Sequence, residues 1–263
     1  MQLKGKVTII FGGGKDIGEE IVKLFVKEGS TVIIADLDES AGKKLTQELK
    51  KDYLTSIEFV SVNIVDEEQV NLVINKVIQE HKKIDILINN IRGDRFREKQ
   101  AFDYSIKEWL ESFKFILGGA YLTTKYTIPH MQRLKKGVIL NISSISGFLI
   151  GDESMNYHIA KAGLTQFTKY VAAKYGSENI RANSVSLGFI VKDKHKMTFE
   201  SSKKKHKAIS VHPLRKVGTN LDVANAVLFL CSDDSGFITG ENLIVDGGLT
   251  IQDQWSVINR EVD

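Results

Sequence analysis

Residues 6–36, KVTIIFGGGKDIGEEIVKLFVKEGSTVIIAD, hold two apolar, β-branched runs separated by a glycine-rich turn and a helix-forming segment. The runs at 6–11 and 31–36 are typical of buried parallel strands. Between them, GGGKDIG at 12–18 leads into a segment whose apolar positions indicate a buried helix that ends at Gly29. A glycine turn between a strand and a helix points backbone N–H groups and a helix N-terminus at one spot. That spot suits a phosphate group.

The second of these strands ends at Asp36, beyond the last glycine of the turn, Gly18. A carboxylate at this place can accept hydrogen bonds from the diol of an adenosine ribose, and it repels a 2′-phosphate. Asp36 therefore predicts NAD as the cofactor, with NADP disfavoured. Lys15, in the turn, favours NADP weakly, because a mobile, exposed ammonium counts for less than a carboxylate beside the 2′ position.

The same alternation of strands and helices continues to the end of the chain. Further strands are predicted at 57–64, 83–90, 137–144, 180–187 and 242–248, and helices at 66–81, 105–131, 154–175 and 220–232. Alternation of this kind implies right-handed crossovers and a parallel sheet covered on both faces, which is the α/β class. No internal repeat or linker divides the chain, so we expect a single domain over residues 1–263.

The composition fits one globular domain and excludes several functions. The chain has 263 residues, of which 42% are apolar and 26% charged, enough for a large core. Its net charge of +3 is too small to indicate a nucleic-acid partner. The single cysteine, Cys231, excludes an internal disulfide and is expected in the core. Without a signal-peptide pattern or a membrane-spanning apolar run, we expect a soluble, cytoplasmic protein with no membrane partner.

The stretch VILNISSISGFLIGDESMNYHIAKAG at 138–163 places Ser144, Tyr157 and Lys161 at spacings that suit proton chemistry. On the helix predicted at 154–175, positions four apart share a face, so the Lys161 ammonium can reach the Tyr157 hydroxyl. A neighbouring cation lowers the pKa of a phenol towards the operating pH, which makes it usable as a general acid or base. Ser144, at the end of a strand, could hydrogen-bond a substrate oxygen. Alone, this spacing is common by chance, and the other motifs give it weight.

Over nearly its whole length the chain resembles the short-chain dehydrogenase/reductase family. The motifs that occur in family order are the glycine turn with Ile17-Gly18, Asp36, Asn89-Asn90, Ser144, Tyr157 with Lys161, and the ending ITGENLIVDGG. The resemblance implies a Rossmann-type doubly wound parallel sheet with NAD(P) across its carboxyl edge. It implies hydride transfer between the nicotinamide and a carbonyl or alcohol carbon. It also implies a homotetramer or homodimer, paired through the helices at 105–131 and 154–175.

The resemblance assigns roles to individual positions. Tyr157 would be the acid/base, Ser144 would hold the substrate oxygen, and Lys161 would bond the nicotinamide ribose and lower the pKa of the tyrosine. The other expected cofactor contacts are Gly12, Lys15, Ile17 and Gly18 in the glycine turn, Asp36 at the adenosine ribose, Asn63 and Ile64 at the adenine, Asn89 beside the cofactor, and Ile190 at the carboxamide. No cluster of metal-ligand residues occurs in the sequence, so we expect no metal.

Several positions depart from the family pattern, including Phe11, before the first glycine of the turn, and Lys192, where a threonine often contacts the cofactor. Two further departures bear most directly on the chemistry. The helix asparagine that in the family holds a water and relays protons from the lysine aligns with Ile116, which cannot hydrogen-bond a water. Alternatively, Ile116 only packs the helix together with Leu110, Phe113 and Leu117. The middle glycine of the turn is Asp16, whose carboxylate would lie beside the pyrophosphate. We predict that Arg92 pairs with Asp16; the alternative is that both side chains are solvated at the rim.

Residues 189–216, where the family carries its substrate lid, are rich in lysine and arginine, and the neighbouring loop adds Arg92, Arg95 and Arg97. A basic mouth could steer an anionic substrate such as an acyl thioester or a carboxylate. A solvated, lysine-rich lid is at least as compatible with the sequence.

The expected function is therefore an NAD-dependent oxidoreductase that interconverts a small secondary alcohol and a ketone. The alternative is a short-chain fold that has lost efficient turnover and acts as a nucleotide-binding or interaction protein. Retention of the three catalytic side chains favours the enzyme. The alternative is favoured by Phe11, Asp16, Arg92, Ile116 and Lys192.

Overall fold

The computed structural model describes residues 1–53, 56–93, 102–191, 196–200 and 204–253. A seven-stranded sheet runs through its centre in the order β3-β2-β1-β4-β5-β6-β9, with every neighbouring pair parallel. Its strands are β1 (Val7–Phe11), β2 (Thr31–Asp36), β3 (Ile57–Ser61), β4 (Ile86–Asn89), β5 (Gly137–Ser144), β6 (Ile180–Leu187) and β9 (Asn242–Val245). The predicted Rossmann-type parallel sheet is confirmed. The order reverses between β1 and β4, and this is where parallel α/β sheets bind ligands.

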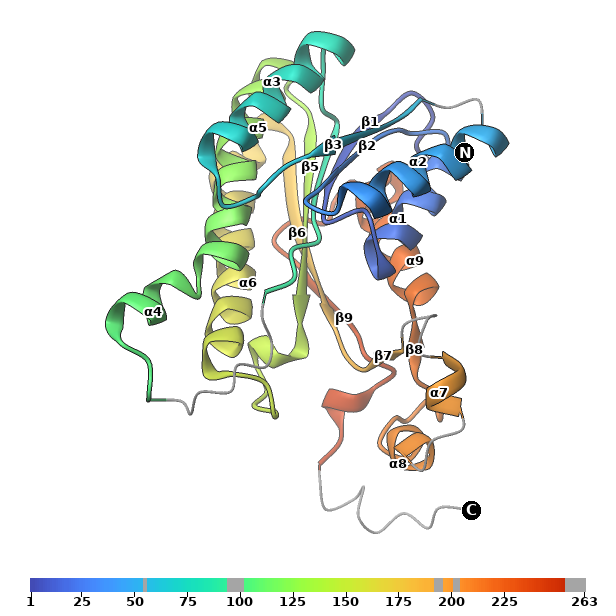
Figure 1. Cartoon of the computed structure of the whole chain (residues 1–263), viewed down its shortest axis with the longest axis vertical. Helices are drawn as coiled ribbons and strands as arrows, with labels where there is room; N and C mark the ends of the chain where they lie inside the picture. Colours follow the sequence, from blue (N-terminus) through green and yellow to red (C-terminus); the bar gives the residue numbers. More distant parts are fainter. Residues whose placement is uncertain (54–55, 94–101, 192–195, 201–203, 254–263) are drawn as a thin grey trace.

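Helices cover both faces of the sheet (Figure 1). One face carries α1 (Asp16–Lys27), α2 (Glu39–Asp52) and α9 (Asn220–Cys231), and the other carries α3 (Glu67–His81), α5 (Gly119–Leu134) and α6 (Met155–Tyr175). The predicted elements did not include α2. Its sequence is dominated by charged residues, and only a narrow stripe that contains Leu45 and Leu49 is buried. In the described part of the chain, no helix has both the length and the apolar character that a bilayer crossing requires.

Strand β1 shows how the core is divided between the two faces. All five of its residues are buried, because helices cover both sides of the sheet. Ile10 packs into the cluster that includes Val22 and Phe25 of α1, whereas Ile9 and Phe11 pack into the opposite cluster. Cys231 belongs to the first cluster, as predicted, and burial raises the pKa of its thiol to about 12.

The long helix predicted at 105–131 is not one α-helix. The structure has α4 (Ile106–Glu111), a π-helical turn at Lys114–Gly118, and then α5. A capping box of Ser105 and Glu108 begins α4. A π-helical turn is less stable than the α-helix it interrupts, and such turns occur frequently at functional sites. Here the turn carries Ile116, whose side chain is buried.

The region predicted as a lid begins with β7 (Ile190–Val191) and continues through α7 (Lys196–Glu200) and α8 (Lys204–Ser210). Strand β7 pairs in parallel with β8 (Gly218–Thr219), outside the main sheet. Figure 1 shows α4 and this region on the two sides of the same end of the sheet, the end at which the strands finish.

Candidate active site

The glycine turn after β1 forms one wall of a cavity of about 390 Å³. Gly12 has φ +78°, and a side chain there would collide with the Asn90 carbonyl oxygen. A side chain at Gly18 would collide with the Gly12 carbonyl oxygen and lie 2.8 Å from Asn90 Nδ2. Asn90 Nδ2 also donates to the Gly12 carbonyl oxygen at 2.7 Å, which ties the loop after β4 to the turn. The backbone therefore packs too closely at these two positions for any residue but glycine.

Asp16 keeps the backbone geometry that a glycine would supply. Its φ is +53°, in the left-handed region, which aspartate tolerates better than most residues. Arg92 Nη1 lies 3.6 Å from Asp16 Oδ2, so the predicted contact between these two side chains is confirmed. The pair places the Asp16 carboxylate against a cation at the edge of the cavity.

Asp36 marks one end of the cavity, at the end of β2. Its carboxylate accepts hydrogen bonds from Gly14 N at 2.9 Å and Asp38 N at 3.0 Å. An ionised carboxylate has about four acceptor positions, so about two remain for hydroxyl groups. The Lys15 ammonium pairs with Asp38, and this hydrogen bond raises the pKa of Lys15 and lowers that of Asp38. Lys15 is therefore bound to a carboxylate, in contrast to the mobile ammonium that the sequence suggested.

Tyr157, Lys161 and Ser144 lie together at the other end of the cavity, as predicted. The two α6 residues are buried, with only 3% of Lys161 exposed, and the Lys161 Nζ lies 5.7 Å from the centroid of the Tyr157 ring. Lys161 Nζ donates to the carbonyl oxygens of Ile142 at 2.7 Å and Ile91 at 3.2 Å. These carbonyl dipoles hold the buried ammonium in a fixed place beside the phenol.

A short network that the sequence did not predict holds Ser144. Its Oγ accepts a hydrogen bond from Ser146 N at 3.1 Å and donates to Ser146 Oγ at 3.1 Å. His158 Nδ1 lies 2.7 Å from the Ser146 carbonyl oxygen, and His158 directly follows Tyr157 on α6. The helix that carries the tyrosine therefore also fixes the turn that carries the serine. In the sequence, only its position next to Tyr157 could have indicated that His158 belongs to the site.

Ile116, in the π-helical turn, packs in the same apolar cluster as Tyr157 and is not among the residues that line the cavity. It is 2% exposed and belongs to an apolar cluster with Ile91, Tyr157 and Leu164. A side chain on Gly93 would lie 2.7 Å from Ile116 Cδ1, so the isoleucine fills the space above that glycine. Of the expected packing partners, Phe113 and Leu117 join the cluster.

Leu110, the third expected packing partner of Ile116, does not join the cluster. It is 56% exposed. The expectation is wrong at this position because Leu110 belongs to α4, which ends at Glu111, whereas Ile116 belongs to the π-helical turn at Lys114–Gly118, so the two do not share one continuous α-helix.

Most of the residues predicted to contact the cofactor or substrate line the cavity, and two, Gly18 and Asn89, do not. The predicted residues that line the cavity are Gly12, Lys15, Ile17, Asp36, Asn63, Ile64, Ser144, Tyr157, Lys161 and Ile190. Gly18 is not among the lining residues, and it packs against the backbone of Gly12 and Gly13. Asn89 is fully buried instead, where it donates to Asn141 Oδ1 at 2.9 Å and accepts from Thr123 Oγ1 at 2.8 Å. Its neighbour Asn90 lines the cavity, because successive side chains of a strand point to opposite faces.

Several expectations fall outside the described residues. Arg95, Arg97 and Lys192 are among them, together with parts of the region predicted as a lid. The absence of a metal stays a prediction. Among the described residues, Glu58, Glu80 and His81 bring possible ligand atoms within 4.8 Å of one another, and none of the three lines the cavity.

Comparison with known proteins places these observations in a family. Residues 13–250 match the family model described as enoyl-(acyl carrier protein) reductase. The chain is 35% identical to 3-oxoacyl-(acyl-carrier-protein) reductase FabG from Aquifex aeolicus over 249 residues, which covers 95% of this chain and 99% of that protein. It is 30% identical to 7alpha-hydroxysteroid dehydrogenase from Clostridium sardiniense, covering 95% of each. A solved short-chain dehydrogenase/reductase structure from Burkholderia xenovorans superposes with a TM-score of 0.86 at 28% identity, covering 96% of this chain and 99% of that one.

Proposed function

The chain belongs to the short-chain dehydrogenase/reductase family, and on that premise we propose that it is an NAD-dependent enzyme that interconverts a secondary alcohol and a ketone. The observation that carries the proposal is that Asp36 and the group of Ser144, Tyr157 and Lys161 line one and the same cavity. A dinucleotide that spans such a cavity would bring its reactive ring to the tyrosine.

The residues at the glycine turn fit a dinucleotide. Gly12 and Gly18 keep side chains away from the N-terminus of α1, so a pyrophosphate can approach the backbone N–H groups there. Asp36 keeps acceptor positions for the adenosine ribose diol. A 2′-phosphate would meet the carboxylate of Asp36, and the nearby Lys15 is already paired with Asp38. These contacts support NAD over NADP.

Proton transfer is the part of the reaction that belongs to this chain's own residues. When bound, the nicotinamide supplies the acceptor or donor of the hydride. Tyr157 takes the hydroxyl proton of an alcohol, or donates a proton to a ketone oxygen in the reverse direction. Ser144 Oγ holds the same oxygen. The Lys161 ammonium, 5.7 Å from the centroid of the Tyr157 ring, would stabilise the phenolate form by its charge.

Return of the proton to Tyr157 must proceed without a polar side chain at Ile116. The isoleucine fills its place in an apolar cluster and offers no hydrogen bond. Lys161 Nζ, however, reaches the carbonyl oxygens of Ile91 and Ile142. We propose that proton exchange uses water beside these two carbonyl groups, and that it limits turnover.

The walls near the catalytic end suit a substrate with an apolar body around its carbonyl group. They include Ile91, Phe115, Leu187 and Ile190. Arg92, which lines the same cavity, is a cation that could hold a carboxylate or an acyl thioester carrier, and it already contacts Asp16 of the glycine turn. The region at 189–216 is proposed as the lid over this end.

Pairing into a homotetramer or homodimer through α5 and α6 is supported by exposed Tyr121 and Tyr170 on those helices.

The alternative function, a nucleotide-binding protein with impaired turnover, is favoured by the burial of Ile116 beside Tyr157. An absorbance assay of the nicotinamide separates the two. NAD is supplied with a panel of secondary alcohols, and NADH with the matching ketones. The proposal predicts saturable turnover of at least one pair, lost in Ser144→Ala while NAD binding persists. NAD binding without turnover of any alcohol or ketone would support the alternative.

A further inference from the structure

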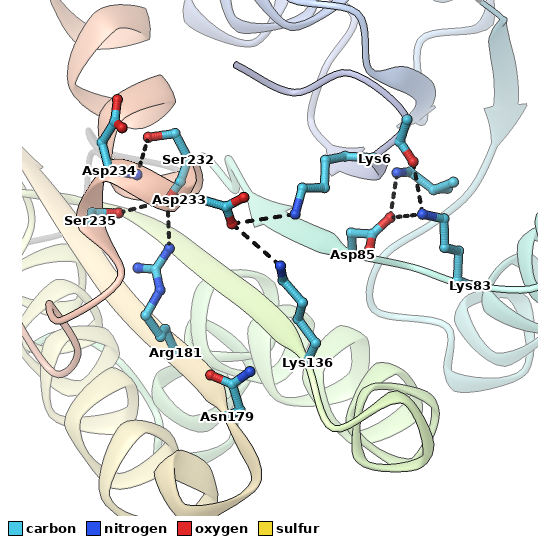
Figure 2. Close-up of polar contacts among 12 residues, drawn as sticks. Lys6, Lys83, Asp85, Lys136, Asn179, Arg181, Ser232, Asp233, Asp234 and Ser235 are labelled. Atoms are coloured by element: carbon cyan, nitrogen blue, oxygen red, sulfur yellow. Dashed lines mark hydrogen bonds and ion pairs between the residues drawn. The ribbon is translucent and has the colours of Figure 1, made fainter. Parts of the chain in front are cut away.

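A second cavity, of about 110 Å³, lies at the opposite edge of the sheet from the catalytic residues. It is formed where β1, β5 and β6 begin, beside the turn that follows α9. Lys6, Lys136 and Arg181 come from the starts of β1, β5 and β6, and Figure 2 shows both lysines reaching the carboxylate of Asp233. We refer to these four residues as the amino-edge cluster.

The two lysines share a single carboxylate oxygen. Lys6 Nζ and Lys136 Nζ each lie 3.4 Å from Asp233 Oδ1. Only 17% of the Lys6 side chain is exposed, whereas 73% of the Asp233 side chain is exposed to water. The shared anion is therefore the most solvated member of the group. Burial, followed by the neighbouring Lys136 ammonium, lowers the pKa of Lys6.

Arg181 adds a third cation whose charge no carboxylate of the described residues neutralises directly. Its guanidinium donates to the carbonyl oxygens of Leu230 at 3.0 Å, Ser232 at 3.0 Å and Ile238 at 3.2 Å. These bonds close the C-terminus of α9. Burial lowers the pKa of the Arg181 guanidinium.

Asp85 also lines the cavity, and its charge attracts Lys136, but its ion pair is with Lys83, outside the cluster. Its Oδ2 accepts a hydrogen bond from Val7 N at 2.8 Å and lies 2.9 Å from Lys83 Nζ. The Asp85 charge is thus matched by Lys83. The amino-edge cluster is left with three cations against the one exposed carboxylate of Asp233, which is an excess of two positive charges around a small cavity.

We propose that this cavity binds a small tetrahedral oxyanion, with inorganic phosphate as the ligand chemistry. Ammonium and guanidinium groups are the usual partners of phosphate oxygens. A dianion matches the excess charge of the cluster. The cavity has the volume of roughly three or four liquid waters, which suits an oxyanion and excludes a nucleotide. The ligand would tie together the starts of β1, β5 and β6.

Binding to the folded state alone stabilises that state by mass action, so phosphate should raise the melting temperature. The experiment records thermal unfolding of the full chain against inorganic phosphate, with sodium chloride added to keep the ionic strength constant. Lys136→Gln is the test variant, because its side chain is half exposed and tolerates replacement. Lys125→Gln is the matched control, since it removes the same charge from an exposed pair with Glu67.

The expected result is a saturable rise in melting temperature in the wild type and in Lys125→Gln. In Lys136→Gln the apparent phosphate dissociation constant should increase at least about tenfold, which corresponds to 1.4 kcal/mol. Sulfate should act like phosphate, and acetate should not.

Equal responses in all three proteins would overturn the proposal, because they would indicate general salt effects or phosphate bound at the glycine turn. A wild type that does not respond to phosphate would also overturn it. An acetate response as large as that to phosphate would contradict the tetrahedral oxyanion.

Discussion

The large cavity and its surroundings depart from the family pattern in two regions, at the glycine turn and beside Tyr157, and the two departures have different physical consequences. At the glycine turn, Asp16 stands where the family pattern has a glycine but keeps the left-handed backbone, and Arg92 faces its charge. Beside Tyr157, Ile116 stands where the family pattern has an asparagine, and it is packed into an apolar cluster. Under the proposed function, the first change would leave the surface for a cofactor intact, and the second would remove a hydrogen-bonding group without replacing it.

Under the proposed function, cofactor binding and turnover would depend on different physical features of one cavity. Binding would rely on close backbone packing at Gly12 and Gly18 and on one carboxylate, Asp36. Turnover would rely on a buried phenol and ammonium and on a route for protons to reach them. Variants at the two ends should therefore change different measured quantities.

The largest effect is expected for Tyr157→Phe, at the catalytic end. The phenyl ring keeps its packing beside Ile116 but has no proton to exchange, so kcat should fall by about 10²–10⁴-fold. The NAD dissociation constant, measured by calorimetry, should stay unchanged. Turnover in this variant close to that of the wild type would mean that another group is the acid/base.

A smaller but clear effect is expected for Gly18→Ala, in the glycine turn. The added methyl group would collide with the Gly12 carbonyl oxygen and force the turn open. NAD binding should weaken by about tenfold or more, with a lower melting temperature. Gly176→Ala is the control, because no atom lies within 4 Å of a side chain added there. Equal behaviour of the two variants would contradict the close-packed turn.

Ile116→Asn should sharpen the comparison by restoring a polar group to the π-helical turn. If proton return limits turnover, kcat should rise several-fold, on the order of tenfold, while NAD affinity stays constant. The amide enters an apolar cluster, so we expect a loss of stability of about 1–3 kcal/mol. Ile116→Val controls for the change in packing. A kcat no higher than that of Ile116→Val would show that proton return is not limiting.

The smallest effect is expected for Arg92→Ala. Exposed ion pairs contribute roughly 0–1 kcal/mol, so NAD affinity should weaken by at most about fivefold. The loss should disappear when Asp16 is replaced by glycine, because the arginine then has no carboxylate to offset. Calorimetry on the two single variants and the double variant measures this coupling. If Arg92→Ala left the NAD affinity unchanged, the result would contradict the idea that Arg92 offsets the negative charge of Asp16 beside the cofactor.

Sequence patterns predicted the parts of the fold that follow from burial on both sides of the sheet. The apolar runs at 6–11 and 31–36 are continuous because their strands have no solvent face, so they could be recognised without a structure. Helix α2 was missed because its buried stripe is narrow and its surface is charged. The π-helical turn was missed because periodicity does not distinguish one long helix from two helices joined by a turn.

In the candidate site, too, the sequence predicted what local patterns determine and missed what depends on contacts between distant elements. Residues fixed by local motifs, such as Asp36 and Tyr157, line the cavity where they were expected. The sequence did not show which of the neighbouring residues Asn89 and Asn90 would line the cavity, because successive side chains point in opposite directions at the end of β4. The contact between His158 and the turn that carries Ser144 joins two elements in space, and no spacing in the sequence predicts it.

The most direct test of the account is a calorimetric titration of the protein with NAD and with NADP, for the wild type and for Asp36→Ala. We predict saturable binding of NAD and at least about tenfold weaker binding of NADP, with the difference reduced in Asp36→Ala because the carboxylate that repels the 2′-phosphate is absent. Binding of NADP as tight as that of NAD, or no binding of either, would contradict the assignment of this cavity as an NAD site.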